Sequence, residues 1–262
     1  MPEGDTVHRT ARSLAAALDG ETLSATDFRV PEFATHDLAG QPVTGSIARG
    51  KHLLLRIGSD WTLHTHLKME GSWHLYRLGT RWRRPAHDAR VVLTTPSWQA
   101  VGFSLGVVEL LARDAEVSAV GHLGPDLLGP DWDAPEAIRR LLAAPDRPIA
   151  PALLDQRNLA GIGNMYAAEV LFLSGIDPRT PVGSVTSLDR LVELARSILT
   201  ANVERAVQST TGSLVPGRRL WVHLRAAEAC RRCGATIRRQ MLGPPGRERA
   251  TYWCPNCQPV AG

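Results

Sequence analysis

The sequence has little cysteine, few aromatic residues and no long apolar run, and each shortage excludes a class of protein. Of 262 residues 4 are Cys and 5% are aromatic, whereas 44% are hydrophobic, enough for sizeable cores in a multi-domain protein. No run of about eighteen apolar residues is present, so we expect no transmembrane helix. The opening stretch MPEGDTVHRT lacks the apolar segment of a secretory signal. We therefore expect a cytosolic protein with no membrane partner.

Positive charge is modest in total but unevenly spread. The net charge is +4 and the pI is about 9.2. One group of arginines lies between residues 77 and 84, and a denser one comprises Arg218, Arg219, Arg225, Arg231, Arg232, Arg238, Arg239, Arg247 and Arg249. Clustered arginine is typical of a surface that binds a phosphate backbone. Either group taken alone is equally compatible with an ordinary solvated surface.

The hydrophobic periodicity changes along the chain. Residues 6–18 have helical spacing and end at Gly20, and short apolar runs at 53–57, 61–67, 72–76, 89–95 and 106–111 predict strands of a β-sandwich or barrel. The stretch 122–135 is dense in Gly, Pro and Asp and predicts a domain boundary. The segments that follow are helical in pattern, the last of them running from Ser187 to Gln208.

All four cysteines lie near the C-terminus in two C-x-x-C pairs. Cys230 and Cys233 are separated from Cys254 and Cys257 by twenty residues. This spacing matches a tetrahedral four-thiolate zinc site, and a fully protein-ligated zinc is structural rather than catalytic. A thioredoxin-like redox pair is the alternative, but no βαβ pattern surrounds these cysteines. We therefore predict one structural Zn²⁺ per chain.

Pro2 gives the N-terminus a chemical reactivity that the rest of the chain does not have. Removal of Met1 would leave a secondary amine, which attacks an electrophilic sugar carbon to form an iminium (Schiff base). Glu3 is adjacent and suits proton transfer. Many chains begin with these residues without consequence, so the motif alone predicts nothing.

Several separated motifs together resemble the formamidopyrimidine-DNA glycosylase/endonuclease VIII (Fpg/Nei) family. In order they are PEG at 2–4, ARGKHLLLRI at 48–57, HLKMEGSW at 66–73, LLDQRNLAGIGNMYAAEVLF at 153–172 and RATYWCPNCQ at 249–258. The resemblance implies an α+β multi-domain fold. Its parts are an N-terminal β-sandwich (1–121), a helix–two-turn–helix domain (122–225) and a C-terminal four-cysteine zinc finger (226–262). It also implies a monomer that acts on damaged DNA, duplex and also single-stranded, in base excision repair.

The resemblance assigns a role to each matching residue. Pro2 is expected to be the nucleophile that displaces a damaged base and then permits β,δ-elimination, with Glu3 as general acid/base and Lys51 on a phosphate. Asn164, Arg157 and Arg249 are expected to contact the DNA backbone, and Met69 to fill the gap left by the flipped nucleotide. Outside the motif, Lys51 would be an ordinary loop lysine and Met69 an ordinary core methionine. No redox or nucleotide cofactor is expected.

Three departures favour the endonuclease VIII branch and oxidised pyrimidines over the guanine-repair branch. Lys68 stands where that branch commonly has Gly, the stretch Val101–Ser104 keeps Phe103 but has no Arg, and the segment between Thr211 and Cys230 is short. His64 and His66 alternate on a predicted strand, but without a further ligand at fitting spacing they predict no second metal site.

Two other functions remain open from the sequence. A catalytically silent protein of the same fold would bind damaged DNA without cleaving it. A zinc-ribbon transcription or translation factor would explain the cysteines but none of the other motifs.

Overall fold

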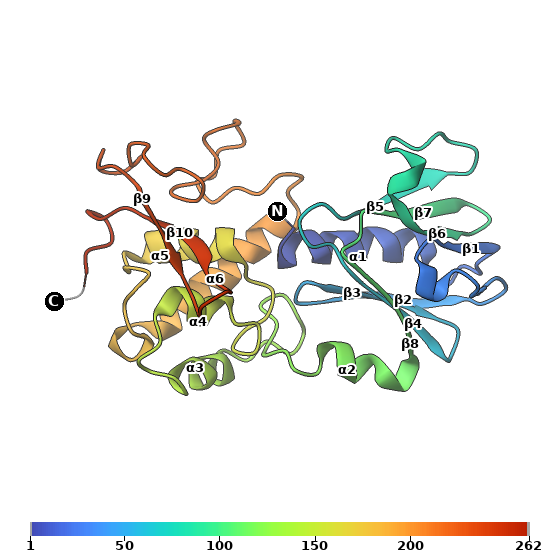
Figure 1. Ribbon diagram of the computed structural model, residues 1–262, viewed down its shortest axis with the longest axis horizontal. Helices are drawn as coiled ribbons and strands as arrows, with labels where there is room; N and C mark the ends of the chain where they lie inside the picture. Colours follow the sequence, from blue (N-terminus) through green and yellow to red (C-terminus); the bar gives the residue numbers. More distant parts are fainter. Residues whose placement is uncertain (1, 261–262) are drawn as a thin grey trace. The chain divides into compact units, whose positions relative to one another are not determined.

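The computed structural model describes residues 2–260, which divide into two compact units, Met1–His122 and Leu123–Gly262. Figure 1 shows strands in the first unit and mainly helices in the second. Among the described residues, no helix combines the length and apolar content needed to cross a membrane.

The first unit is a sandwich of two antiparallel four-stranded sheets. One sheet has the order β1-β6-β7-β5 and the other β2-β3-β4-β8. The strands are β1 Ala25–Phe28, β2 Val43–Arg49, β3 His52–Ile57, β4 Trp61–His66, β5 Ser72–Arg77, β6 Ala89–Thr94, β7 Trp98–Phe103 and β8 Val107–Ala112. Helix α1 (Gly4–Leu18) packs against β2, and the short α2 (Glu116–Val120) follows β8.

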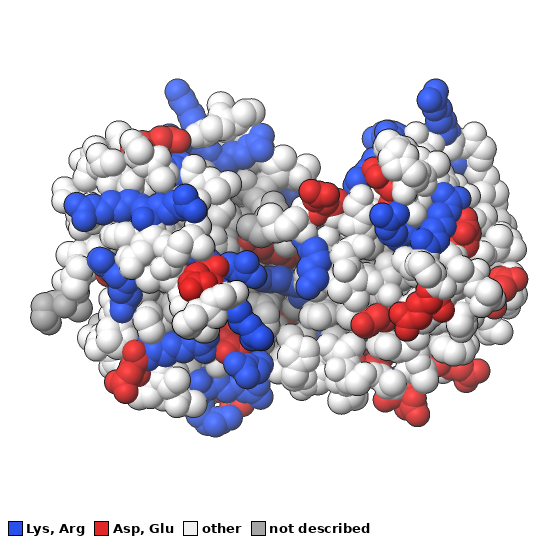
Figure 2. Space-filling model, viewed as in Figure 1, with Lys and Arg blue, Asp and Glu red and all other residues white. Residues whose placement is uncertain are grey.

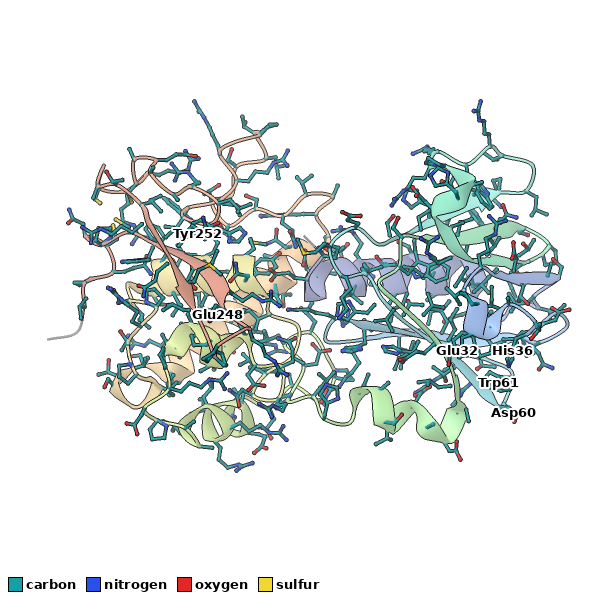
Figure 3. The ribbon with its side chains drawn as sticks, viewed as in Figure 1. Glu32, His36, Asp60, Trp61, Glu248 and Tyr252 are labelled. Carbon is teal, nitrogen blue, oxygen red and sulfur yellow. The ribbon has the colours of Figure 1, made fainter. Side chains whose placement is uncertain are left out.

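Alternating side chains of the strands build the core between α1 and the sheets. Leu53, Leu55 and Ile57 of β3 are fully buried in one cluster with residues of α1, β4 and β6. At the margin of this unit, His36 meets Trp61 edge-on with ring centroids 6.0 Å apart (Figure 3). The opposite face of β3 carries the polar side chains His52 and Arg56 on either side of the buried Leu54.

The second unit is built around helices that share a separate apolar core. They are α3 Ala134–Leu142, α4 Ile149–Leu154, α5 Asn164–Ser174 and α6 Leu188–Val203. Residues Met165–Phe172 of α5 are all buried, and all but Glu169 and Tyr166 are apolar, as expected for a helix in the middle of a core. The helix ends at Gly175, whose φ of +69° is the left-handed conformation that glycine adopts without strain.

The cysteine segment packs onto α5. Strands β9 (Arg238–Leu242) and β10 (Arg249–Trp253) form an antiparallel hairpin, and Ala168 and Phe172 of α5 share a cluster with Cys230 and Tyr252. The hairpin thus gains the core that so short a segment cannot build alone. Short 3₁₀ turns occupy Pro31–Phe33, Ala86–Asp88, Arg113–Ala115 and Val182–Ser184.

The predicted fold class is confirmed, with corrections at individual elements. The sequence pattern missed β1, β2 and β7. The last helix was predicted to reach Gln208 but ends at Val203. The reason is Asn202, whose side chain bonds both the N–H and the carbonyl of Ser209 and folds the chain back over the helix end.

Candidate active site and nucleic-acid interface

Pro2 and Lys51 lie at the same end of the first unit because α1 and β2 run in opposite directions over equal lengths. Gly20, just after α1, donates to the carbonyl of Val43 at the start of β2. Helix α1 has 15 residues and β2 has 7, and at about 1.5 and 3.3 Å per residue each spans about 22 to 23 Å. The β2–β3 turn thus returns to the N-terminal end of α1 (Figure 1).

The turn that carries Lys51 is a two-residue hairpin. Arg49 pairs with His52 across it, and Gly50 has a φ of +57°. A side chain at that conformation would be strained, so glycine suits the position. Lys51 is half-buried, and the turn fixes where its backbone leaves the sheet.

Met69 belongs to the same end of the unit. His52 pairs with His66 at the end of β4, so the Leu67–Gly71 turn that follows lies beside the Lys51 turn. Met69 is 64% exposed, which rules out a core methionine. An exposed, long, unbranched apolar side chain is suited to insertion between bases.

The N-terminal residues differ in exposure. Pro2 is half-buried and Glu3 is 1% exposed, directly before the first residue of α1. The expected removal of Met1 concerns a residue outside the described part of the chain. A carboxyl group as buried as Glu3, next to the chain's first amine, is suited to proton transfer rather than to surface charge.

A chain of polar contacts crosses the outer face of the β2-β3-β4-β8 sheet next to this end. His52 Nδ1 lies 2.8 Å from His64 Nε2, and His64 Nδ1 lies 2.7 Å from Glu109 Oε2. His64 faces Glu109 directly across β4 and β8. Sequence spacing did not reveal this, because Glu109 is 45 residues away from His64.

The histidines do not form a metal centre. Both ring nitrogens of His64 are engaged, one by His52 and the other by Glu109. Within residues 2–260, the group of His, Cys, Asp and Glu side chains close enough to share an ion is the set of four cysteines.

In the second unit, Asn164 and Arg249 are brought together although they are far apart in the sequence. Asn164 is the first residue of α5, and its Nδ2 donates to the carbonyl of Ala250 at 2.9 Å. Arg249 precedes Ala250 on β10 and is exposed. A helix N-terminus with an adjacent guanidinium is suited to a phosphate group.

Arg157 is exposed but already paired. Its guanidinium makes a two-pronged contact with Asp155, with Nε and Nη2 at 2.9 and 2.8 Å from the two carboxylate oxygens. This contact lowers the pKa of Asp155. A phosphate that binds Arg157 must share it with this carboxylate, so its contribution to DNA binding should be smaller than that of Arg249.

The four cysteine sulfurs are arranged as a metal ion requires. They all lie within 4.8 Å of one another, with Cys230 and Cys257 3.9 Å apart and Cys233 and Cys254 3.4 Å apart. A tetrahedral zinc with bonds of about 2.3 Å needs sulfurs roughly 3.8 Å apart. The residues therefore fit the ion. Burial and the neighbouring thiols raise the pKa of Cys257, a shift that a bound dication reverses.

A buried carboxylate anchors the segment that leads into the cysteines. Glu169 of α5 accepts the backbone N–H groups of Trp221, Val222 and His223 at 2.7 to 2.9 Å, and the hydroxyl of Thr210. Its side chain is fully buried. Tyr252 of β10, which is labelled in Figure 3, packs edge-on to His223 with ring centroids 5.2 Å apart.

Basic side chains gather over the segments that the sequence singled out. Figure 2 shows arginine side chains over the cysteine hairpin in the second unit and over the loop between β5 and β6 in the first, since neither segment contains lysine. In that loop Arg81 and Arg83 are exposed. Most of both groups therefore belong to the protein surface, but Arg225 is buried and bonds the carbonyls of Trp221 and Ala229.

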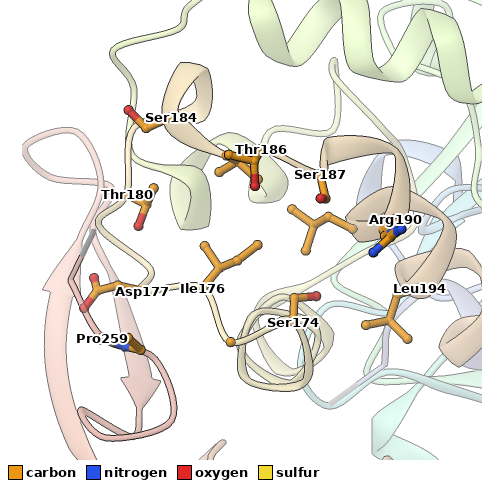
Figure 4. A pocket seen from close by; sticks show the side chains of 13 residues that line it. Ser174, Ile176, Asp177, Thr180, Ser184, Thr186, Ser187, Arg190, Leu194 and Pro259 are labelled. Atoms are coloured by element: carbon orange, nitrogen blue, oxygen red, sulfur yellow. The ribbon is translucent and has the colours of Figure 1, made fainter. Parts of the chain in front are cut away.

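One pocket of the second unit lies apart from the predicted site residues. It has a volume of about 520 Å³ and is lined by hydroxyl groups such as Ser184 and Thr186, by Arg190 and by apolar side chains such as Ile176 (Figure 4). None of the residues that the sequence predicted for catalysis, DNA binding or metal binding lines it.

Comparison with known proteins matches both units. Residues 1–104 match the formamidopyrimidine-DNA glycosylase N-terminal domain, and residues 123–213 match the H2TH domain of the same glycosylase. A "Probable endonuclease 8 2" of Streptomyces coelicolor is 51% identical, covering 98% of this chain and 94% of that protein. The chain belongs to the formamidopyrimidine-DNA glycosylase/endonuclease VIII family.

Further relatives place it within that family. The Mycolicibacterium smegmatis protein named "DNA-(apurinic or apyrimidinic site) lyase Nei2" is 50% identical over 98% of this chain and 99% of its own length. Lactococcus lactis Fpg, solved in complex with an abasic site containing DNA, is 25% identical with a TM-score of 0.81 over 98% of this chain and 100% of that one. The predicted resemblance to the endonuclease VIII branch is thus confirmed.

Proposed function

We propose that this member of the family is a bifunctional DNA glycosylase and abasic-site lyase of base excision repair. The observation that carries the proposal is the shared end of the first unit: Pro2 and Glu3 lie at the N-terminal end of α1, and the Lys51 turn and the exposed Met69 belong to the same end. The relatives named endonuclease 8 and abasic-site lyase support it.

The chemistry begins with the amine of Pro2, exposed once Met1 is removed. The reference pKa of an α-amino group is about 8, so part of it is unprotonated near neutral pH. The positive end of α1 further disfavours an added proton. The nitrogen attacks C1′ of the damaged nucleotide, the bond from C1′ to the base breaks, and the base leaves with a proton.

The covalent iminium that results makes elimination feasible. Loss of a proton from C2′ expels the 3′ phosphate, and a second elimination expels the 5′ phosphate, which leaves a one-nucleotide gap. Glu3 opens the sugar ring as general acid and then moves these protons. Lys51 binds a phosphate near the lesion, and Asn164, Arg249 and Arg157 hold the backbone.

One structural zinc on Cys230, Cys233, Cys254 and Cys257 supports the hairpin that carries Arg249. The spacing of the sulfurs supports this assignment. The ion stabilises the folded hairpin and takes no part in the reaction. The domain limits 1–121, 122–225 and 226–262, the monomeric state and action in the bacterial cytosol belong to the same proposal.

Oxidised pyrimidines are the proposed substrates, in duplex and also in single-stranded DNA. The support comes from Lys68 and the short segment between Thr211 and Cys230. Phe103 is fully buried, so it does not project toward DNA. A cleavage panel with thymine glycol, dihydrouracil, 5-hydroxyuracil, 8-oxoguanine and abasic sites tests this preference.

Borohydride reduction tests the catalytic proposal directly. The protein should form a covalent adduct with an abasic duplex, and Pro2→Gly or an N-terminal tag should reduce or abolish it. Glu3→Gln should still be trapped on a preformed abasic site but should lose base excision. A wild-type protein with a processed N-terminus that forms no adduct would contradict the lyase assignment.

A catalytically silent DNA-binding protein is the second candidate. The exposed arginines of the hairpin favour DNA binding whether or not the amine reacts. N-terminal sequencing of the protein from cells separates the two, because a retained Met1 blocks the amine.

A further inference from the structure

The turn that presents Met69 holds an unfavourable backbone conformation. Lys68 has a φ of +52°, in the left-handed region that residues with side chains rarely occupy. Gly71 closes the turn by donating to the carbonyl of Leu67 at 2.9 Å, and a Cβ at Gly71 would lie 2.4 Å from that oxygen. Such turns persist only where surrounding contacts over-determine them.

A second turn of the same kind packs against the first. Ser104, between β7 and β8, has a φ of +47°. Gly106 donates to the carbonyl of His66 at 3.0 Å, and a Cβ at Gly106 would lie 2.2 Å from Cγ of Lys68. The turn at Ser104 therefore packs directly against the side chain of Lys68.

Arg84 joins these turns from a third segment, the loop between β5 and β6. Nη1 donates to the carbonyl of Glu70 at 3.2 Å and to Ser72 Oγ at 3.1 Å. Nη2 donates to Ser104 Oγ at 2.8 Å and to Asp88 Oδ2 at 3.1 Å.

The geometry of these contacts requires a guanidinium. The Arg84 guanidinium carbon lies 5.4 Å from the ring centre of the buried Phe103, so the guanidinium packs over a fixed aromatic ring. A planar fork reaches four acceptors at once, which an ammonium on a flexible stem does not. Its neighbours Arg81 and Arg83 are exposed, whereas Arg84 is 28% exposed and engaged on both edges.

We propose that Arg84 is a positioning residue that holds the Met69 turn in the shape needed to enter the DNA stack. This inference rests on the proposed function, because it takes Met69 as the side chain that fills the gap. A stack to be filled exists only in a duplex. Arg84 therefore sets activity on duplex DNA more than activity on single strands.

Single-turnover rates on a duplex lesion and on a single-stranded abasic site test the proposal. Arg84→Ala should slow the duplex reaction about tenfold to a hundredfold, the range expected for a misplaced group, and should leave the single-strand lyase rate nearly unchanged. Arg84→Lys should behave like Arg84→Ala. The milder Ser72→Ala, which removes one acceptor, should show the same selectivity with a smaller loss.

Met69→Ala combined with Arg84→Ala should be no slower on duplex than Met69→Ala alone, because both changes remove the same function. Arg83→Ala removes an equal charge next door and should affect duplex and single strand alike. Three results would each overturn the proposal: wild-type duplex activity in Arg84→Lys, additive losses of duplex activity in the double variant, or an equal loss of duplex activity in Arg83→Ala. Each would mean that Arg84 acts only through its positive charge.

Two failures are distinguishable in this design. If the wild-type protein gives no borohydride adduct on either substrate, the proposed function fails. If the wild-type protein is active on both and Arg84→Ala keeps the wild-type ratio of duplex to single-strand rates, only the role of Arg84 fails.

Discussion

His52 and His64 are hydrogen-bonded ring to ring, with Nδ1 of His52 2.8 Å from Nε2 of His64. One of these two nitrogens must carry a proton and the other must accept it, so the pair cannot be doubly protonated and keep the contact. The other ring nitrogen of His64, Nδ1, is hydrogen-bonded to Glu109, and this contact fixes the tautomers of the two histidine rings. The arrangement makes this face of the sheet sensitive to acid.

The first prediction is an acid-dependent loss of stability from these histidines. Burial and the positive neighbours His64, His66, His122 and Lys68 lower the pKa of His52 to about 3. Burial, Lys68, Lys51 and His64 lower that of His66 to about 4. The unfolded chain has the ordinary value near 6.5 and binds protons first. This stabilising contribution is therefore complete above pH 6.5 and is lost as the pH falls toward 4.

Thermal unfolding at pH 7.5 and 4.5 measures the effect. The wild-type Tm should fall by several degrees more than that of His52→Gln/His66→Gln, since both lowered pKa values lie below the lower pH and a change of 1 kcal/mol shifts a domain of this size by about 2 to 4 °C. Glu109 stays in both proteins, so the comparison isolates the two imidazoles. Equal losses in the two proteins would contradict the prediction.

The strands that the sequence revealed are those with short apolar runs. Strand β3 places Leu53, Leu55 and Ile57 on one face, and its pattern is visible without a structure. Strand β2 has the sequence VTGSIAR, in which only Val43 and Ser46 are buried, so its pattern is too weak to read. Strand β2 is held in place instead by its pairing with β3 and its packing against α1.

Some residues of the site could likewise be predicted from the sequence and others could not. Pro2, Glu3 and the cysteines are visible because they form local motifs, whereas Arg84 meets Ser104 across 20 residues and Asn164 meets Ala250 across 86. These contacts depend on sheet order and on hairpin docking, which spacing along one chain does not encode. The resemblance found Asn164 but gave no role to Arg84, since Arg84 itself lies outside the motifs although Glu70 and Ser72 lie within one.

Loss of the Glu169 carboxylate should destabilise the second unit. In Glu169→Gln an amide N–H₂ replaces one of the oxygens that receive Trp221, Val222 and His223, so buried N–H groups lose their acceptor. We expect a loss of about 2–4 kcal/mol in the free energy of unfolding, measured by urea denaturation. Glu193→Gln, on the exposed face of α6, is the matched control and should change stability by less than about 0.5 kcal/mol. A small effect of Glu169→Gln would mean that the segment rearranges to find new acceptors.

Removal of the metal should disorder the cysteine hairpin and leave the first unit folded. Chelation, or Cys233→Ser, should release one zinc per chain, measured with a colorimetric zinc dye, and should weaken DNA binding at least about tenfold, because loss of the ion costs binding-competent structure. The first unit has its own core without any cysteine, so its strand signal in circular dichroism should persist. Loss of that signal together with zinc would contradict the independence of the two cores.

Arg249 should contribute one phosphate contact that is measurable by its salt dependence. Its side chain is exposed on β10, next to the carbonyl that Asn164 holds. Removing one phosphate contact lowers the slope of log Kd against log salt concentration by about 1. We therefore expect Arg249→Ala to reduce that slope by about 1 on duplexes of any sequence, and Arg157→Ala to reduce it less, since Asp155 already neutralises that guanidinium. Arg190→Ala removes an exposed charge from α6 and is the control for net charge alone. An equal change in slope for Arg190→Ala and Arg249→Ala would show that long-range charge, rather than a contact at β10, governs binding.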